Sequence, residues 1–299
     1  MTLEALVAAE LAVPLEPRVA AMAAALAGKY GEAACAVLFY GSCLRTTELE
    51  GQMLDFYLIV SDYRAAYGRS WLARANALLP PNVFPFQHGG LAAKYAVLSL
   101  DHLRRECGAG ARDPSTYARF AQPARLAWSK DETATRAVEA TVARAAPTLL
   151  TFAAPFVPEH ERSDRLAIWR TAFGLTYRAE LRAEKGGRAA SIVDADPERY
   201  RRFTAAILSQ QPGLDGPFDE RARNAAKASW RQAARRGKRR QVLRLAKAAF
   251  TFAGGIDYLA WKINRHAGTK IVIKPWQRRH PFLAALTLLP RLLSSGAVR

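Results

Sequence analysis

Two short apolar runs near the start of the chain, joined by a polar connection, have the pattern of neighbouring β-strands. The first, Ala34–Tyr40, is rich in residues that favour strands and stops at Gly41. In the second run, residues 53–61, the side chains alternate, so that one face carries Leu54, Phe56, Leu58 and Val60 and the other carries Asp55, Tyr57 and Ile59. We therefore predict two strands, with Asp55 facing away from the larger apolar set.

The rest of the pattern predicts helices around these strands. Residues 3–27 are rich in alanine and interrupted by prolines, which indicates two short helices that we expect to pack as a lid on the sheet. Helical spacing predicts a helix over residues 63–79, followed by a loop over 80–90 and a third strand over 93–99. Mainly helical segments follow residue 114. This order of elements favours the α+β class.

A short segment rich in proline and glycine, residues 211–217, is the best candidate for a domain boundary. Beyond it, residues 222–252 predict a basic helix, or a pair of helices broken near Gly237, with an apolar stripe that packs and a basic face in water. We therefore predict one domain over residues 1–210 and a mostly helical, basic domain over residues 218–299.

Charge is distributed unevenly along the chain, whose formal net charge is +18. Residues 221–299 hold 19 basic side chains and one acidic one, whereas residues 1–220 hold 25 of each. Such a basic segment suits a polyanion, either nucleic acid or an anionic membrane surface, and the sign of the charge does not choose between them. The three cysteines have neither the spacing of a zinc site nor that of a disulfide framework.

A carboxylate in an apolar strand, such as Asp55, is costly unless it is paired or binds a metal. One interpretation is an edge strand from which Asp55 reaches water or caps a neighbour. The other is the palm of a nucleotidyltransferase, in which the small residues Gly41 and Ser42 let backbone N–H groups approach a phosphate and the acid of the next strand holds Mg²⁺. The strand pattern alone leaves both interpretations open.

An ordered set of residues around this unit resembles the mitochondrial-type phosphatidate cytidylyltransferases, also called the translocator assembly and maintenance family. The set begins with Tyr40-Gly41-Ser42 and Met53-Leu54-Asp55-Phe56, and the resemblance covers roughly residues 37–268. Later positions that fit are Asp62, Ser70, Asn76, Lys94-Tyr95, Gly174-Leu175-Thr176-Tyr177, Glu180, Arg182, Lys262 and Ala267-Gly268. Cys43 stands where the family usually has glycine, and Glu180 stands where it usually has aspartate.

The resemblance implies a polymerase-β-like nucleotidyltransferase palm and a reaction between CTP and phosphatidic acid that yields CDP-diacylglycerol and pyrophosphate. It implies that Asp55 and Glu180 hold Mg²⁺ and that Lys94 neutralises the triphosphate. It also implies a nucleotide-binding role for Gly41, Ser42, Tyr95 and Arg182.

The end of the chain points to a lipid surface. Residues 275–293 place Trp and Arg side chains next to an apolar segment, which fits the membrane interface, although such a segment could equally dock on the protein's own core. No secretory signal and no run of about 20 apolar residues is present. We therefore expect a cytoplasmic protein, peripheral on the inner face of the cell membrane. The alternatives are a nucleotidyltransferase acting on RNA or a small alcohol, and a non-catalytic nucleic-acid-binding protein.

Overall fold

A five-stranded mixed sheet forms the centre of the structure, a computed structural model that describes residues 1–44, 49–179, 188–251 and 272–279. The strands follow the order β3-β4-β2-β1-β5. They are β1 (Ala34–Tyr40), β2 (Met53–Val60), β3 (Asn82–His88), β4 (Leu91–Ser99) and β5 (Ala124–Ser129). β2 pairs in parallel with β4, and the other neighbours are antiparallel. Both strands predicted around Gly41 are therefore confirmed, as is the third, and the fold is mixed α and β.

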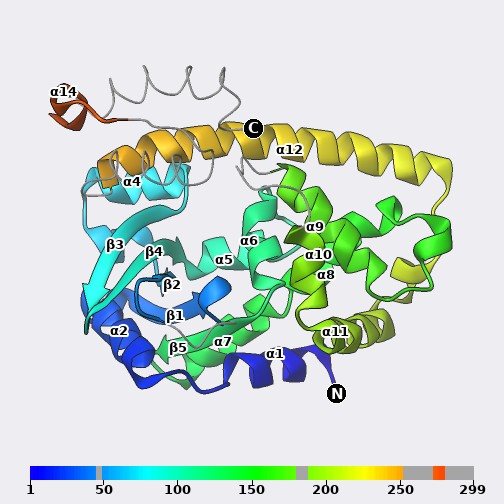
Figure 1. Cartoon of the computed structure of the whole chain (residues 1–299), viewed down its shortest axis with the longest axis horizontal. Coiled ribbons are helices and arrows are strands. Elements are labelled where there is room, and N and C mark those ends of the chain that lie inside the picture. The colour runs from blue at the N-terminus through cyan, green and yellow to red at the C-terminus, as the bar shows by residue number, and fades with distance from the viewer. Residues whose placement is uncertain (45–48, 180–187, 252–271, 280–299) are drawn as a thin grey trace.

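Helices surround the sheet and extend beyond one side of it (Figure 1). In chain order they are α1 (Leu3–Leu11), α2 (Pro17–Gly28), α3 (Tyr63–Tyr67), α4 (Trp71–Leu78), α5 (Leu100–Glu106), α6 (Pro114–Phe120), α7 (Glu132–Val142), α8 (Ala145–Ala153), α9 (Ala167–Ala179), α10 (Arg188–Asp194), α11 (Pro197–Gln210), α12 (Glu220–Thr251) and α14 (Pro275–Arg279). Helices α6 and α8–α11 gather beside the sheet, and α12 runs across the top of the molecule.

Both faces of the sheet are buried. Successive side chains of a strand point to opposite faces, so they belong to two separate apolar clusters. Phe56 and Leu58 of β2 belong to the cluster that α2 covers. Tyr57 and Ile59 belong to the other cluster, which includes side chains of α1, α5–α9 and α11. The two N-terminal helices are confirmed, but they do not form one lid, because α1 and α2 contribute to opposite faces of the sheet.

The position of β2 excludes one of the two interpretations of Asp55. β2 lies at the centre of the sheet, between β4 and β1, so the edge-strand interpretation is wrong. β3 is the real edge strand beside β4, and it occupies most of the predicted 80–90 loop. Its Pro85 explains the misreading, since proline lacks a donor for the sheet and is tolerated on edge strands.

α12 is one continuous helix of 32 residues, so the chain passes through Gly237 without a break. It contacts β3, α6 and α9, and near its end the Arg244 Nε donates to the carbonyl oxygen of Pro80 at 2.6 Å. Lys247 donates to the carbonyl oxygens of Leu79 and Pro81. Among the described helices, α12 included, none is long and apolar enough to cross a membrane. The division of the chain at residues 211–217 stays a prediction.

Candidate functional site

An ion pair between Asp55 and Lys94 lies at one end of the central strands. The parallel pairing of β2 with β4 sets these two residues side by side, and strand alternation turns both side chains to the face that carries Tyr57. Lys94 Nζ is 2.9 Å from Asp55 Oδ1, and the two side chains are 27% and 19% exposed. The buried carboxylate therefore has a cationic partner of its own, which reduces the cost of placing it in the sheet.

Gly41 closes over the same carboxylate. It ends β1 directly after Tyr40, the cross-strand partner of Asp55, and its backbone has φ of 99°, a conformation that favours glycine. A Cβ at this position would lie 3.1 Å from Asp55 Oδ2, closer than ordinary van der Waals contact. Ser42 follows, exposed, in a short 3₁₀ turn. The structure thus brings Gly41, Ser42, Asp55 and Lys94 to one end of the sheet, and their roles in binding stay a prediction.

Aromatic rings and one arginine lie next to this group on the same face. Tyr40 and Tyr57 have ring centroids 5.1 Å apart, and Phe120 of α6 is 5.1 Å from Tyr57. The Arg119 guanidinium lies 4.9 Å from the centroid of Tyr40, a cation–π distance. Sequence reasoning missed Arg119, because only the packing of α6 on the sheet brings it to the end of β1.

Other predicted site residues lie elsewhere. Tyr95 is 2% exposed on the opposite face of the sheet from Lys94, with its hydroxyl 3.1 Å from that of Tyr30. Burial raises the pKa of the Tyr95 hydroxyl, so the side chain stays neutral. The structure does not bring Tyr95 together with Asp55. Glu180 and Arg182 lie outside the described residues.

Among the described residues at this end of the sheet, one side chain, Asp55, could act as a ligand of Mg²⁺. Asp55 Oδ1 is paired with Lys94 Nζ at 2.9 Å, but a carboxylate has lone pairs beyond the one that faces the lysine, so Asp55 could still ligate a cation. Cys43 is close by, but burial, and then Asp55, raise its thiol pKa, which keeps it protonated. In the part of the chain that the structure describes, no three His, Cys, Asp or Glu side chains lie close enough together to hold a metal ion. A Mg²⁺ site at Asp55 would therefore need a further acidic ligand from outside the described residues.

Asp62 and Ser70, which also fit the resemblance, lie at the other end of β2. Asp62 caps α3 by accepting hydrogen bonds from the backbone N–H groups of Arg64 and Ala65, at 2.7 and 2.9 Å. Both residues line an open hollow of about 570 Å³. Asn76 is fully buried and donates to the Val97 carbonyl at 2.9 Å, so it ties α4 to the sheet.

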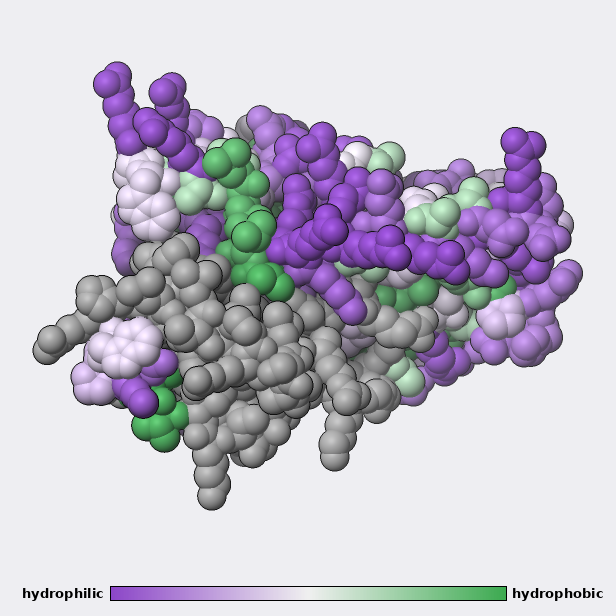
Figure 2. All heavy atoms as spheres, turned by 90° about the horizontal axis from the view of Figure 1, so that it is seen from above, coloured by the Kyte–Doolittle hydropathy of each residue, from purple (hydrophilic) through white to green (hydrophobic). Residues whose placement is uncertain are grey.

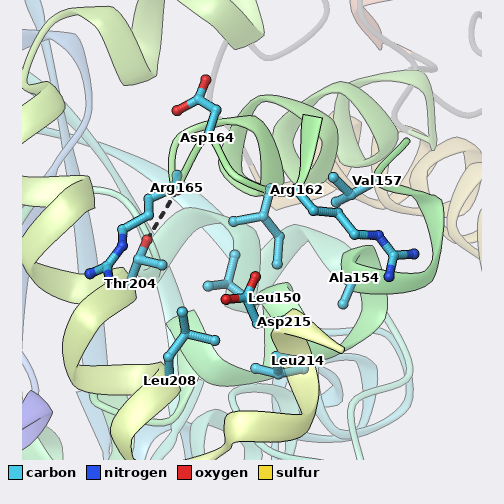
Figure 3. A pocket seen from close by; sticks show the side chains of 11 residues that line it. Leu150, Ala154, Val157, Arg162, Asp164, Arg165, Thr204, Leu208, Leu214 and Asp215 are labelled. Atoms are coloured by element: carbon cyan, nitrogen blue, oxygen red, sulfur yellow. Dashed lines mark hydrogen bonds between the residues drawn. The ribbon is translucent and has the colours of Figure 1, made fainter. Parts of the chain in front are cut away.

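A further hollow lies among helices α8, α9 and α11 (Figure 3). Its volume of about 30 Å³ is that of roughly one water molecule, far too small for a nucleotide. Thr204 on its wall donates a hydrogen bond to the Arg165 carbonyl at 3.2 Å. This hollow is therefore a packing feature of the helices.

Comparison with known proteins does not assign the chain to a family. No protein-family model matches the chain, and no curated protein is significantly similar to it. Among solved structures, the chain is similar to a nucleotidyltransferase-like protein from Exiguobacterium sibiricum 255-15, with 10% identity over 93% of this chain and 91% of that one and a TM-score of 0.27. A TM-score of that size does not establish a common fold, so function has to be inferred from the side chains of the site.

Proposed function

We propose that the protein is a Mg²⁺-dependent nucleotidyltransferase that transfers CMP from CTP to phosphatidic acid and releases pyrophosphate. The observation that carries this proposal is the grouping of Gly41, Asp55 and Lys94 at one end of the sheet. It combines a turn without side-chain bulk, a mostly buried carboxylate, and a lysine paired with it at 2.9 Å. Such a set serves a ligand that carries phosphates and a divalent cation.

Each residue then has a distinct role. The backbone N–H groups at Gly41 and Ser42 bind phosphate oxygens, because a turn without bulky side chains permits close approach. Lys94 neutralises phosphate charge, and Arg182 adds a further contact. Asp55 and Glu180 hold Mg²⁺, which when bound offsets the negative charge that develops during phosphoryl transfer. Tyr95 supports the strand that carries Lys94 from the other face.

The acceptor is proposed from the surface of the molecule. Figure 2 looks onto the side of α12, where hydrophilic side chains form a broad band. Large apolar side chains are exposed as well, among them Trp71, Leu78 and Trp276 at 54%, 81% and 41%. Basic and aromatic side chains on one protein suit an anionic membrane. A cytoplasmic enzyme at the inner face of the cell membrane would meet phosphatidic acid there.

The direct test is transfer of label from the α-phosphate of CTP. With Mg²⁺ and phosphatidic acid in mixed micelles, label should move into a lipid that is extracted by organic solvent, and ATP, GTP and UTP should serve poorly. Label on RNA or on a water-soluble alcohol, with none in lipid, would refute the acceptor and leave nucleotidyl transfer in place. Absence of transfer from any nucleotide would refute the enzyme.

Membrane attachment is tested separately by truncation after Lys274. The shortened protein should no longer sediment with anionic liposomes, because basic residues near such a surface contribute on the order of 1 kcal/mol each. Its affinity for soluble nucleotide should stay the same. Unchanged sedimentation would assign the last segment to the protein's own core.

A further inference from the structure

Four arginines surround a hollow of about 510 Å³ between α12 and the turn that joins α5 to α6. Arg236, Arg239 and Arg240 lie on α12 with the i, i+3, i+4 spacing that places side chains on one face of a helix. Arg112 closes the hollow from the turn, far away in the sequence. Four cationic side chains therefore converge on one space.

The carboxylates close to this hollow are already engaged elsewhere. Glu106 accepts hydrogen bonds from the backbone N–H groups of Arg112 and Asp113, at 3.0 and 3.1 Å. Asp113 is 2.6 Å from Arg244, one helical turn beyond Arg240. Burial raises the pKa of Asp113, but Arg244 and the hydrogen bonds from Ser115 bring it below its ordinary value, so this acid stays charged and paired.

None of the four arginines that line the hollow forms a side-chain hydrogen bond or an ion pair with another residue of the described ranges. The charge of one of them, Arg240, reaches a neighbour: burial first, and then Arg105, Arg244 and Arg240, lower the pKa of His102 to about 3. The ring nitrogen Nε2 of neutral His102 accepts a hydrogen bond from Arg105 Nη2 at 2.7 Å. Positive charge around a concave space that no side chain of the described residues offsets is stabilised by an anion.

We propose that the arginine pocket, Arg112, Arg236, Arg239 and Arg240, is a second anion site that binds a phosphate monoester. Guanidinium groups pair with phosphate oxygens in bidentate geometry, and a monoester offers three such oxygens with close to two charges at neutral pH. A phosphodiester offers fewer free oxygens and one charge. The ligand is therefore a terminal phosphate, free in solution or at the head of a lipid.

The pocket and the Asp55 group lie at the two ends of α6. Arg112 precedes the first residue of α6, and Arg119 near its last residue lies over Tyr40, the strand partner of Asp55. Seven residues of helix span roughly 10 Å. The pocket is therefore a separate site, and this inference goes beyond the proposed transfer reaction.

The test is binding by the full chain of inorganic phosphate and glycerol 3-phosphate, measured by calorimetry and by the rise in Tm at constant ionic strength. The double variant Arg236→Gln/Arg239→Gln should bind both ligands at least about tenfold more weakly. Losing one hydrogen bond to a charged group commonly lowers affinity by close to tenfold or more. Arg236 and Arg239 are both exposed, so folding should be unaffected. Arg231→Gln/Arg235→Gln, with the same change of charge on the same helix, should bind like the wild type.

Vesicles distinguish the two sources of the phosphate. Phosphatidylcholine vesicles that contain phosphatidic acid are compared with vesicles that contain phosphatidylglycerol, a phosphodiester, at equal surface charge. A preference for phosphatidic acid that is lost only in Arg236→Gln/Arg239→Gln assigns a lipid headgroup, and phosphate binding without that preference assigns a soluble ligand. Equal losses in both double variants, or RNA binding as tight as that of the monoesters, would overturn the inference. Asp55→Asn should leave this binding unchanged, which separates it from the proposed reaction.

Discussion

Two charged regions of this molecule are built in opposite ways. At the end of the central strands Asp55 is paired with Lys94, and both side chains are mostly buried in the sheet. Beside α12 the arginine pocket gathers four cations and, among the described residues that line it, no acid. A buried charge needs a partner inside the fold, because removing it from water is costly. Exposed cations stay hydrated, so they need no partner in the protein and can bind an anion from solution. The Asp55–Lys94 pair therefore contributes to the stability of the fold as well as to a candidate site, whereas the arginine pocket contributes only to a candidate site.

The largest expected effect comes from breaking the pair. Asp55→Asn should lower nucleotidyl transfer by about three orders of magnitude or more, because losing a metal ligand costs several kcal/mol in the transition state. Glu180→Gln should have a similar effect. The measurement is the initial rate of label transfer from CTP at saturating Mg²⁺, with circular dichroism to confirm the fold.

A double variant separates a structural ion pair from a working site. Asp55→Asn alone leaves Lys94 without its acid, whereas Asp55→Asn/Lys94→Gln removes both charges and should recover part of the lost stability. Transfer should stay lost in the double variant. Recovery of the rate together with stability would mean that the pair serves only the fold.

The next effect concerns the close approach of the turn to Asp55. Gly41→Ala should lower the free energy of unfolding by about 2 kcal/mol, from the positive φ and from the contact of the new Cβ with Asp55 Oδ2. Gly51 is the matched control, since it also has positive φ, 69°, but no atom within 4 Å of a Cβ. Gly51→Ala should cost about half as much in urea unfolding. Equal losses would show that Asp55 does not limit this position.

A smaller effect reports the charge around the arginine pocket. The pKa of His102 is about 3 in the fold and near 6.5 in the unfolded chain, so the unfolded chain binds the extra proton between these values. The free energy of unfolding should therefore fall as pH drops from 6.5 towards 3. His102→Gln should reduce that slope, and a slope equal to that of the wild type would contradict the assignment.

The contact of His102 with Glu106 does not reverse this expectation. Glu106 Oε1 lies 3.7 Å from His102 Nε2, beyond hydrogen-bond distance, while Arg105 Nη2 lies 2.7 Å from the same nitrogen. Phosphate in the arginine pocket should weaken the pH dependence, because it offsets the charge of Arg240.

The smallest effect tests which face of the sheet matters. Tyr95→Phe removes the hydroxyl that lies 3.1 Å from Tyr30, and should cost about 1 kcal/mol of stability. Transfer should change by less than about twofold, because Tyr95 faces away from Asp55. Tyr30→Phe is the control that removes the other hydroxyl of the pair. A large loss of transfer with unchanged stability would place Tyr95 in the nucleotide site.

The sequence by itself determined the local unit on which the proposal depends. Alternation placed Asp55 within a strand, and the small residues after β1 predicted the turn at Gly41, because both are properties of neighbouring residues. The basic face of α12 was predictable for the same reason. Separation of Lys94 from Tyr95 also follows from alternation, since successive strand residues point to opposite faces.

Tertiary structure decided everything that depends on partners far along the chain. Parallel pairing of β2 with β4 set Lys94 beside Asp55, and the central place of β2 removed the edge-strand interpretation. β3 escaped prediction because Pro85 within it, and the two prolines just before it, are typical of a loop, and proline is tolerated in a strand only at the edge of a sheet. The arginine pocket likewise exists only because α12 packs near the α5–α6 turn and meets Arg112 there. Strand pairing and helix packing bring together residues that are far apart in the sequence. The pattern of apolar and polar residues along the chain therefore does not predict these contacts.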